Sequence, residues 1–203
     1  MPDARLVHVI DDDEDVRESL AFLLESAGFA VETYDSGTRF LESGAHESGC
    51  VVTDVRMPGL DGLELAVRLK ARGSPLPVIV ITGHADVPLA VEAMRSGVQD
   101  FIEKPFDDVT LITAIETALS RPQAPQGDRH QRLETLQRME SLSGRERQVL
   151  QALVGGQSNK AMARDLGISP RTVEIYRAKV MTKMGAESLS QLVRMSILAA
   201  FDA

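Results

Sequence analysis

The 203-residue sequence has no tryptophan, one cysteine and only four histidines, and it contains no long apolar run. The single cysteine, Cys50, excludes an intramolecular disulfide and a cysteine-rich zinc module, and no helical histidine pair suggests another zinc site. A membrane-spanning helix would need roughly 18 consecutive apolar residues, and the first residues lack the basic-then-apolar layout of a secretory signal. We therefore expect a cytoplasmic protein with no membrane partner.

The composition is that of a globular protein, with 43% hydrophobic and 26% charged residues. The charge is unevenly distributed along the chain. Residues 1–122 hold 10 Lys or Arg against 22 Asp or Glu, a net charge of −12. Residues 123–203 hold 12 against 8, a net charge of +4, so the formal charge of the chain is −8. The asymmetry indicates contact with nucleic acid or a membrane surface through the second part.

Short β-branched runs alternate with helical patterns over the first 120 residues, which is typical of a parallel sheet with helices on both faces. We predict an α/β fold, a doubly wound five-stranded parallel sheet, followed by a small all-α domain. The predicted strands are Leu6–Ile10, Ala30–Tyr34, Cys50–Thr53, Val78–Ile81 and Phe101–Glu103. The predicted helices are Glu14–Ala27, Thr38–Leu41, Leu63–Arg72, Val87–Ser96 and Asp107–Leu119.

Two prolines and a glycine near residue 122 end the last of these helices and predict a domain boundary. We divide the chain into a first domain at residues 1–121, a linker at 122–140 and a second domain at 141–203. The later linker has an apolar residue at every third position, namely Leu133, Leu136, Met139 and Leu142. This part could form a helix, which would either lie on its own domain or make a coiled-coil-like contact.

The last 60 residues are helical in pattern. A capping box at Ser143–Glu146 opens one helix, and Ser158 caps a short second helix. After a glycine turn at Gly167, Ser169–Pro170 begins a third helix that runs to Met184, and a fourth helix follows. A short helix, a tight turn and a capped second helix have the proportions of a helix-turn-helix.

Polar side chains suited to one chemistry stand at four of the five predicted strand ends. Asp11 and Asp12 follow the first strand, Asp54 the third, Thr82 the fourth and Lys104 the fifth. The carboxyl ends of parallel strands open onto one edge of a sheet, so we expect these side chains to share a crevice. Three carboxylates at one place require a cation, and their oxygen atoms suit Mg²⁺ better than zinc.

A carboxylate in such a crevice can attack phosphorus and form an aspartyl phosphate. In this interpretation Asp54 is the nucleophile, Asp11 and Asp12 surround the metal, Lys104 neutralises charge and Thr82 donates a hydrogen bond. Taken singly, the acidic run could merely favour a helix N-terminus, and the lysine could be an ordinary surface residue. The coincidence at four strand ends favours phosphoryl chemistry.

The segments Val9–Asp13, Val52–Gly62, Ile81–Gly83 and Phe101–Phe106 resemble the receiver domain of two-component response regulators, over about residues 5–120. The resemblance implies a sensor histidine kinase as the phosphodonor.

It also implies Mg²⁺ bound through Asp12, Asp54 and the main-chain carbonyl of Arg56, with Asp11 acting largely through water. A cis bond between Lys104 and Pro105 is implied too, and the small trans preference of an X-Pro amide permits it.

Activation in that family couples Thr82 to an aromatic residue on the fifth strand, here Phe101. When the phosphoryl group draws the hydroxyl toward it, the ring can turn inward and repack residues 87–103 into a dimer surface. Phe101 could also be a plain core residue. Arg56 and His84 flank the phosphoryl site. They could either shield the phosphoryl group from water or assist its hydrolysis, and the sequence leaves both roles open.

In a helix-turn-helix the second helix enters the major groove of DNA. Val173, Tyr176 and Val180 are spaced to face the core, although Tyr176 could also offer its hydroxyl to a phosphate. The residues left to face bases are Arg171, Glu174, Ile175 and Ala178. Those available for phosphates are Lys160, Thr172, Arg177, Lys179 and Lys183. The alternative is a generic helical bundle with solvated Lys and Arg, which the net charge of +4 weakens.

The segments Leu142–Leu150, Gly156–Lys160, Ile168–Glu174 and Lys183–Gly185 resemble the LuxR-type helix-turn-helix. A receiver followed by this module is the layout of the NarL/FixJ group, and the chain is particularly similar to the FixJ members. The resemblance implies binding to double-stranded promoter DNA, RNA polymerase as a further partner and an activating role, although the residues themselves do not give the direction of regulation. Tyr176 replaces a histidine common in the group, so the group's contact there is not transferred.

We therefore predict a phosphorylation-dependent transcriptional regulator that forms a homodimer when Asp54 is phosphorylated. It would not be an enzyme, apart from self-catalysed acceptance and loss of the phosphoryl group. Two alternatives stay open. One is a Mg²⁺ phosphatase, which would lack a substrate cap and would have Arg56 where a general acid is needed. The other is a degenerate receiver that only binds a partner.

Overall fold

A computed structural model describes residues 5–44, 48–83, 87–120 and 126–200 of the chain, so His84 lies outside the described residues. The chain divides into two compact units. The first is Met1–Ala85 with Ser96–Pro122, and it contains all five strands. The second is Asp86–Arg95 with Gln123–Ala203, and helices joined by short turns make up its described residues.

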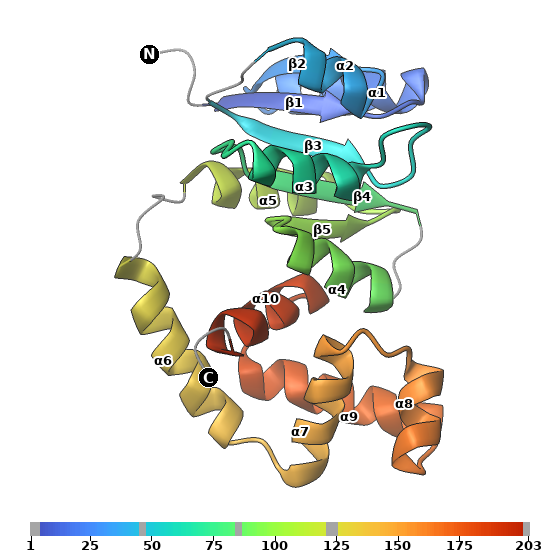
Figure 1. The fold of residues 1–203 in the computed structure, drawn as a ribbon, viewed down its shortest axis with the longest axis vertical. Coiled ribbons are helices and arrows are strands. Elements are labelled where there is room, and N and C mark those ends of the chain that lie inside the picture. The colour runs from blue at the N-terminus through green and yellow to red at the C-terminus, as the bar shows by residue number, and fades with distance from the viewer. Residues whose placement is uncertain (1–4, 45–47, 84–86, 121–125, 201–203) are drawn as a thin grey trace. The chain divides into compact units, whose positions relative to one another are not determined.

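Five parallel strands form the sheet of the first unit in the order β2-β1-β3-β4-β5 (Figure 1). Their bounds are β1 Leu6–Ile10, β2 Ala30–Tyr34, β3 Cys50–Asp54, β4 Val78–Thr82 and β5 Asp100–Glu103. The strand order reverses between β1 and β3, which is the place where doubly wound sheets open a crevice at their carboxyl ends. The predicted doubly wound five-stranded sheet, followed by an all-helical part, is confirmed.

Three strands are one residue longer than their sequence patterns predict: β5 begins one residue earlier, at Asp100, and β3 and β4 end one residue later. β3 includes Asp54, which pairs in register with Ile81, and β4 includes Thr82, which pairs with Glu103. The sheet therefore fixes the backbones of both polar residues, whose side chains are those predicted to lie in the crevice. Alternation of apolar residues could not reveal this, because the last residue of each strand is polar.

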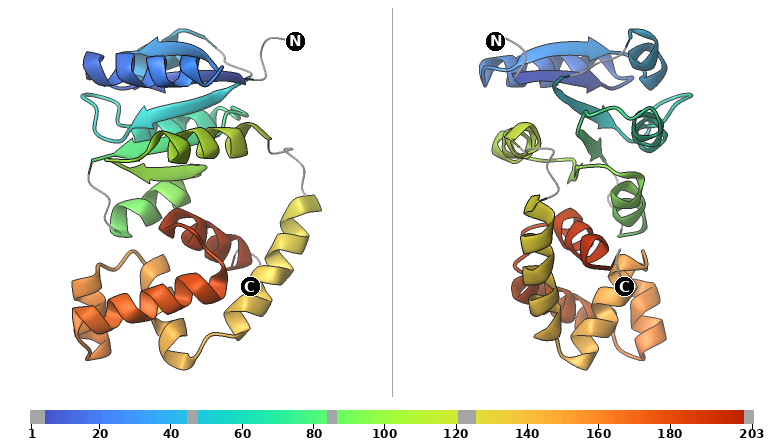
Figure 2. Two further views of the ribbon diagram at one scale, coloured as in Figure 1. Left: turned by 180° about the vertical axis from the view of Figure 1, so that it is seen from behind. Right: turned by 60° about the vertical axis from the view of Figure 1, so that its left-hand side comes forward.

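Helices cover both faces of the sheet (Figure 2). α1 (Glu14–Ser26) and α5 (Asp108–Ser120) lie on one face, and α2 (Gly37–Glu42) and α3 (Gly62–Ala71) lie on the other. Alternate residues of β1, β3, β4 and β5 pack with buried leucines and isoleucines of α1 and α5. Cys50 belongs to this core, and burial raises the pKa of its thiol to about 12. α4 (Val87–Ser96) follows β4 in the chain.

The described residues of the second unit contain five helices besides α4, and three of them begin at the serine caps that the sequence predicts. They are α6 Gln126–Glu140, α7 Gly144–Val154, α8 Asn159–Leu166, α9 Pro170–Met184 and α10 Leu189–Ala200. Ser143 and Glu146 form the complete capping box of α7, and Ser169 caps α9 by accepting a hydrogen bond from Thr172 N. Gly185 ends α9 with a φ of 63°, a left-handed conformation that favours glycine. No helix in the described ranges is both long and apolar enough to cross a bilayer.

α6 occupies most of the predicted linker and packs against α9 and α10. Thr135 is buried on the packed side, with 2% of its surface exposed. Leu133 and Leu136 retain 55% and 38% exposure, so the first half of the apolar stripe points largely away from the unit. The contacts of α6 with α9 and α10 show that the helix lies on its own unit, which is the first of the two arrangements considered for it.

Candidate functional site

Three elements bring two carboxylates and one ammonium group together at the carboxyl edge of the sheet. Asp11 directly follows β1, Asp54 ends β3 and Lys104 directly follows β5. Lys104 Nζ lies 2.9 Å from Asp54 Oδ1 and 3.3 Å from Asp11 Oδ2. Residues separated by 50 and 93 positions in the chain thus share one charged cluster.

Backbone amides hold the other oxygen of each carboxylate. Arg56 N donates to Asp54 Oδ2 at 2.6 Å, and Asp13 N donates to Asp11 Oδ1 at 3.0 Å. The Asp11 side chain is 5% exposed and that of Asp54 is 14% exposed. Asp54 is therefore fixed in orientation and still reachable from solvent, as a phosphoryl acceptor must be.

Burial and the neighbouring charges shift two pKa values in this cluster. Burial raises the pKa of Asp11 above its usual value, and the hydrogen bond from Asp13 and the charge of Lys104 only partly oppose this. Burial alone would lower the pKa of Lys104. The hydrogen bonds and charges of Asp54 and Asp11 outweigh it, so the pKa of Lys104 is raised. The ammonium group is therefore protonated across the neutral range.

The loop from β3 to α3 folds back onto Asp54, and Gly62 makes that approach possible. A Cβ atom at Gly62 would lie 2.2 Å from the carbonyl oxygen of Asp54, closer than atoms can pack. The amide of Gly62 donates to Val55 O at 3.0 Å, and Asp61 caps α3 by accepting from Glu64 N. The sequence reasoning did not single out Gly62, although Asp-Gly at a helix start was a visible signal.

The remaining predicted pocket residues occupy different environments. Thr82 is 1% exposed at the end of β4, and Phe101 is partly buried in β5. Asp12 is exposed at the start of the acidic run. The peptide bond between Lys104 and Pro105 is cis, as the resemblance implies.

The donor set fits a hard divalent cation. Asp11, Asp12 and Asp54 carry three negative charges against the single positive charge of Lys104, and carboxylate and carbonyl oxygens are the ligands that Mg²⁺ prefers. In the described part of the chain, no three acidic, histidine or cysteine side chains already converge as a ready metal cage. A cation here would be held by Asp12 and Asp54, and water and phosphate oxygen would complete its shell.

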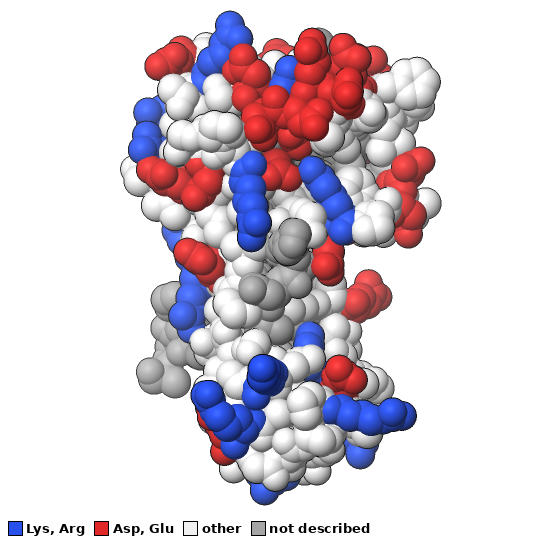
Figure 3. Space-filling model, turned by 90° about the vertical axis from the view of Figure 1, so that its right-hand side faces the viewer, with Lys and Arg blue, Asp and Glu red and all other residues white. Residues whose placement is uncertain are grey.

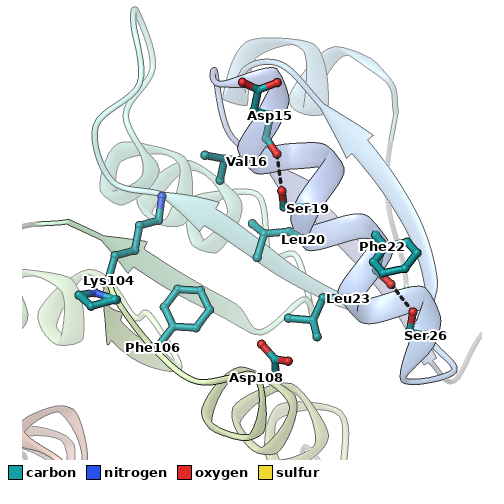
Figure 4. Close-up of a pocket in the computed structure, with 11 residues that line it drawn as sticks. Asp15, Val16, Ser19, Leu20, Phe22, Leu23, Ser26, Lys104, Phe106 and Asp108 are labelled. Carbon is teal, nitrogen blue, oxygen red and sulfur yellow. Dashed lines mark hydrogen bonds between the residues drawn. The ribbon is translucent and has the colours of Figure 1, made fainter.

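A groove of about 690 Å³ lies beside Lys104, between α1 and the segment that joins β5 to α5 (Figure 4). Its walls include Leu20 and Leu23 of α1 and the ring of Phe106. Phe22 at its edge is 75% exposed. The groove thus offers apolar surface next to the ammonium group that contacts Asp54.

In the second unit, α9 has one buried and one exposed face. Val173, Val180 and Met184 are 0% exposed, whereas Ile175 is 51% exposed. The residues predicted to face bases are all exposed: Arg171, Glu174, Ile175 and Ala178. An exposed helix face flanked by basic residues suits the major groove of DNA.

The residues predicted to contact phosphates differ in their partners. Lys160 and Lys179 are exposed, with Lys179 Nζ 5.8 Å from the centre of the Tyr176 ring. Arg177 is partly buried and donates to Asn159, whereas Lys183 is exposed and pairs with Glu146.

Thr172, the fifth of these residues, is partly buried and hydrogen-bonds Ser169. On the face drawn in Figure 3, acidic side chains gather over the first unit and basic ones are frequent over the second.

Comparisons with known proteins cover both units. Residues 7–116 match the response regulator receiver domain, and residues 140–196 match the bacterial regulatory proteins of the luxR family. The transcriptional regulatory protein FixJ of Azorhizobium caulinodans is 58% identical over 200 residues, which cover 98% of this chain and 95% of that protein. FixJ of Bradyrhizobium diazoefficiens is 53% identical over 194 residues, or 95% of each. A crystal structure of full-length FixJ from B. japonicum is 51% identical, with a TM-score of 0.55 and 98% coverage of both chains.

Proposed function

Since the chain belongs to the response regulators that join a receiver domain to a LuxR-type DNA-binding domain, and is a transcriptional regulator of a two-component system, we propose that Asp54 is its phosphoryl acceptor. The observation that carries this proposal is the position of Lys104 Nζ, 2.9 Å from Asp54 and 3.3 Å from Asp11. A sensor histidine kinase supplies the phosphoryl group, and phosphorylation promotes dimerisation and promoter binding.

Each residue of the pocket has a separate role in phosphoryl transfer. An oxygen of Asp54 forms a bond to phosphorus while the bond from phosphorus to the histidine nitrogen breaks, and the electron pair leaves with that nitrogen. Lys104 is placed to neutralise the charge that the phosphoryl group adds, and the hydroxyl of Thr82 donates to one of its oxygens. Asp12, Asp54 and the carbonyl of Arg56 would hold Mg²⁺, with Asp11 acting through water. When bound, the metal would offset negative charge on the phosphoryl oxygens.

The apolar groove beside Lys104 supports docking of the phosphodonor at this edge of the sheet. A kinase that presents its phosphohistidine to Asp54 must lie over the residues around the crevice, and the exposed ring of Phe22 offers apolar contact there. The groove and the acceptor share Lys104 as a common wall residue, so docking and transfer occur side by side.

Phosphorylation in the pocket is transmitted to DNA binding through a change in side-chain packing that leads to dimerisation. We assign the receiver to residues 1–121, the linker to 122–140 and the DNA-binding domain to 141–203. Movement of Thr82 toward the phosphoryl group leaves space for the ring of Phe101, and residues 87–103 then form the homodimer surface. Two recognition helices in one dimer can meet two half-sites on promoter DNA. RNA polymerase is the further partner of an activator at such promoters, and a cytoplasmic location agrees with these partners.

The test combines labelling with a gel shift. Wild type and Asp54→Asn are incubated with labelled acetyl phosphate and Mg²⁺, and then with genomic DNA fragments. Asp165→Asn, which changes an exposed carboxylate of the second unit, is the matched control. We expect label and a phosphate-dependent shift in wild type and Asp165→Asn, and neither in Asp54→Asn. Labelling of Asp54→Asn would reject the acceptor, and steady turnover of a small phosphoester would favour the phosphatase alternative.

A further inference from the structure

Arg177 begins on the core side of α9. Residues three or four apart share a helix face, and Arg177 lies four residues after Val173 and three before Val180, both of which are 0% exposed. The exposed face of the helix, with Ile175 and Ala178, points elsewhere. The position of Arg177 is therefore that of an interior residue whose charged end has to find a partner.

The partner is the first residue of α8. Arg177 Nη1 donates to Asn159 Oδ1 at 2.7 Å across 18 residues of chain. The guanidinium group is half-buried, and burial lowers the pKa of Arg177 despite the opposing charge of Glu174. A half-buried cation depends on its hydrogen bonds for stability, so turning Arg177 toward DNA would leave both it and Asn159 without this bond.

Lys183 makes a similar connection near the other end of α9. Its Nζ lies 2.7 Å from Glu146 Oε2 and 3.3 Å from Ser141 O. The Glu146 side chain is 5% exposed and also accepts from Ser143 N at 2.7 Å, within the capping box of α7. Removing Lys183 would leave a buried carboxylate without its cation, which is costly in a folded protein.

A third contact fixes the carbonyl end of the same helix. Arg138 of α6 donates through Nη1 to Met184 O at 2.9 Å. A Cβ atom at Gly185 would lie 2.7 Å from that same nitrogen, so the glycine leaves room for it. α9 is thus held by α8, α7 and α6 through three basic side chains.

From this geometry we propose that Arg177 and Lys183 are positioning residues that set the angle of α9 against α8 and α7, and that they do not contact DNA phosphates. The proposal rests on the DNA-binding function proposed above and revises the assignment that the sequence pattern gave these two residues. Lys183 is also exposed, with 40% of its side chain accessible, so its assignment rests on the ion pair with Glu146 and not on burial. Lys179, four residues earlier on the same helix, lies over the ring of Tyr176 and stays assigned to phosphate.

The salt dependence of DNA binding separates the two roles. Full-length Arg177→Met, Lys183→Met and Lys179→Met, each treated with acetyl phosphate and Mg²⁺, are titrated with two probes over a range of salt concentrations. One probe is a duplex selected from a random pool by the wild type, and the other is an unselected duplex. Loss of one phosphate contact lowers the slope of log affinity against log salt by roughly 0.9.

We expect Lys179→Met to lower the slope by this amount on both probes and to keep the wild-type Tm. We expect Arg177→Met and Lys183→Met to keep the wild-type slope, to lower Tm and to lose about tenfold or more in affinity for the selected duplex. Their preference for the selected over the unselected duplex should fall, because a misplaced helix loses base contacts before it loses phosphate contacts.

Variants of the partner residues keep the test decisive if a lysine or arginine variant unfolds. Asn159→Ala and Glu146→Gln remove the anchoring bonds without touching a cation, and should reproduce the loss of preference. Combining Asn159→Ala with Arg177→Met should add little further loss. A slope reduced as in Lys179→Met, with Asn159→Ala or Glu146→Gln indistinguishable from wild type, would overturn the proposal for that residue. If the wild type bound neither duplex, the proposed function itself would fall, and this inference with it.

Discussion

Lys104 carries one positive charge that faces two carboxylates at hydrogen-bonding distance, and a third carboxylate, Asp12, lies at the rim. The three acids and the lysine leave a net charge of −2 at the crevice, which a divalent cation can neutralise. Lys104 therefore keeps Asp11 and Asp54 together before any phosphoryl group arrives. While both carboxylates are ionised, the ion pairs contribute fully below the ordinary lysine pKa of 10.5, and the contribution is lost as pH rises through the higher pKa of Lys104 in the folded protein.

Substitution of Asp12 should weaken Mg²⁺ binding. Asp12→Asn lowers the local negative charge from −2 to −1 and removes one proposed ligand, so the rise in Tm on adding Mg²⁺ should be smaller than in wild type. Thermal unfolding over a Mg²⁺ titration measures this, with Asp165→Asn as the control that should behave as wild type. Equal Mg²⁺ responses in all three proteins would exclude Asp12 as a ligand.

Gly62→Ala should disturb the acceptor through the backbone. The added Cβ would stand 2.2 Å from the carbonyl oxygen of Asp54, so the loop must move. A loss of about 1–3 kcal/mol in the free energy of unfolding is typical of such overpacking, and labelling of Asp54 by acetyl phosphate should slow as well. Gly144→Ala, which meets no atom within 4 Å, is the control in urea unfolding. Wild-type stability and labelling in Gly62→Ala would contradict the close approach.

At the scale of single elements, the ends of helices could be predicted from local sequence signals, whereas the residues that each helix contacts in the fold could not. Ser143, Ser169 and Gly185 act on residues within a turn of themselves, so the ends of α7 and α9 could be predicted from the sequence. Arg177 and Lys183 find their partners 18 and 37 residues away, and no periodicity in α9 records where α8 and α7 will pack.

The sheet shows the same division. Parallel topology brings the strand ends together, so the cluster of Asp11, Asp54 and Lys104 could be expected from their places after apolar runs. The need for glycine at position 62 depends on a loop folding back onto Asp54, which is a tertiary event. The polar residues that gather at the strand ends could thus be predicted, whereas a glycine required by a close approach of two backbone segments could not.

The ion pair between Glu146 and Lys183 should give the second unit a distinct response to acid. Its hydrogen bond to Lys183 lowers the pKa of Glu146 from 4.5 to about 2. A depressed acid pKa stabilises the fold above the unfolded value, and the stabilisation is lost as pH falls from 4.5 toward 2.

Urea unfolding of wild type and Glu146→Gln over this pH range measures the effect. The difference in the free energy of unfolding between the two proteins should be largest at neutral pH and should shrink toward pH 2. Glu140→Gln, which changes an exposed glutamate of α6, should show a difference that stays flat. A flat difference for Glu146→Gln would show that the pair does not stabilise the fold.

At the scale of the whole molecule, a net charge of −8 is the sum of an acidic part at −12 and a basic part at +4. The acidic part concentrates carboxylates near a site for a cation and a phosphoryl group, whereas the basic part carries the helix that suits DNA. The charge of the second part therefore favours approach to the DNA backbone, whereas the charge of the first part opposes it at low salt.

Phosphorylation should raise the dimer fraction. Light scattering of wild type with acetyl phosphate and Mg²⁺ should show a shift from monomer toward dimer, and Asp54→Asn should stay a monomer under the same conditions. The salt slope of DNA binding should also steepen in phosphorylated wild type, because a dimer contacts about twice as many phosphates. Self-association of Asp54→Asn that ignores acetyl phosphate would count against this coupling.

The two-sided α9 also makes the protein a practical starting point for engineering. Its buried residues, with Arg177 and Lys183 of α9 and Arg138 of α6, connect it to the rest of the unit. Four other residues of the helix are exposed, namely Arg171, Glu174, Ile175 and Ala178. A library confined to those four positions would explore new promoter sequences without disturbing the phosphorylation input. The same receiver could then be directed to genes of the experimenter's choice.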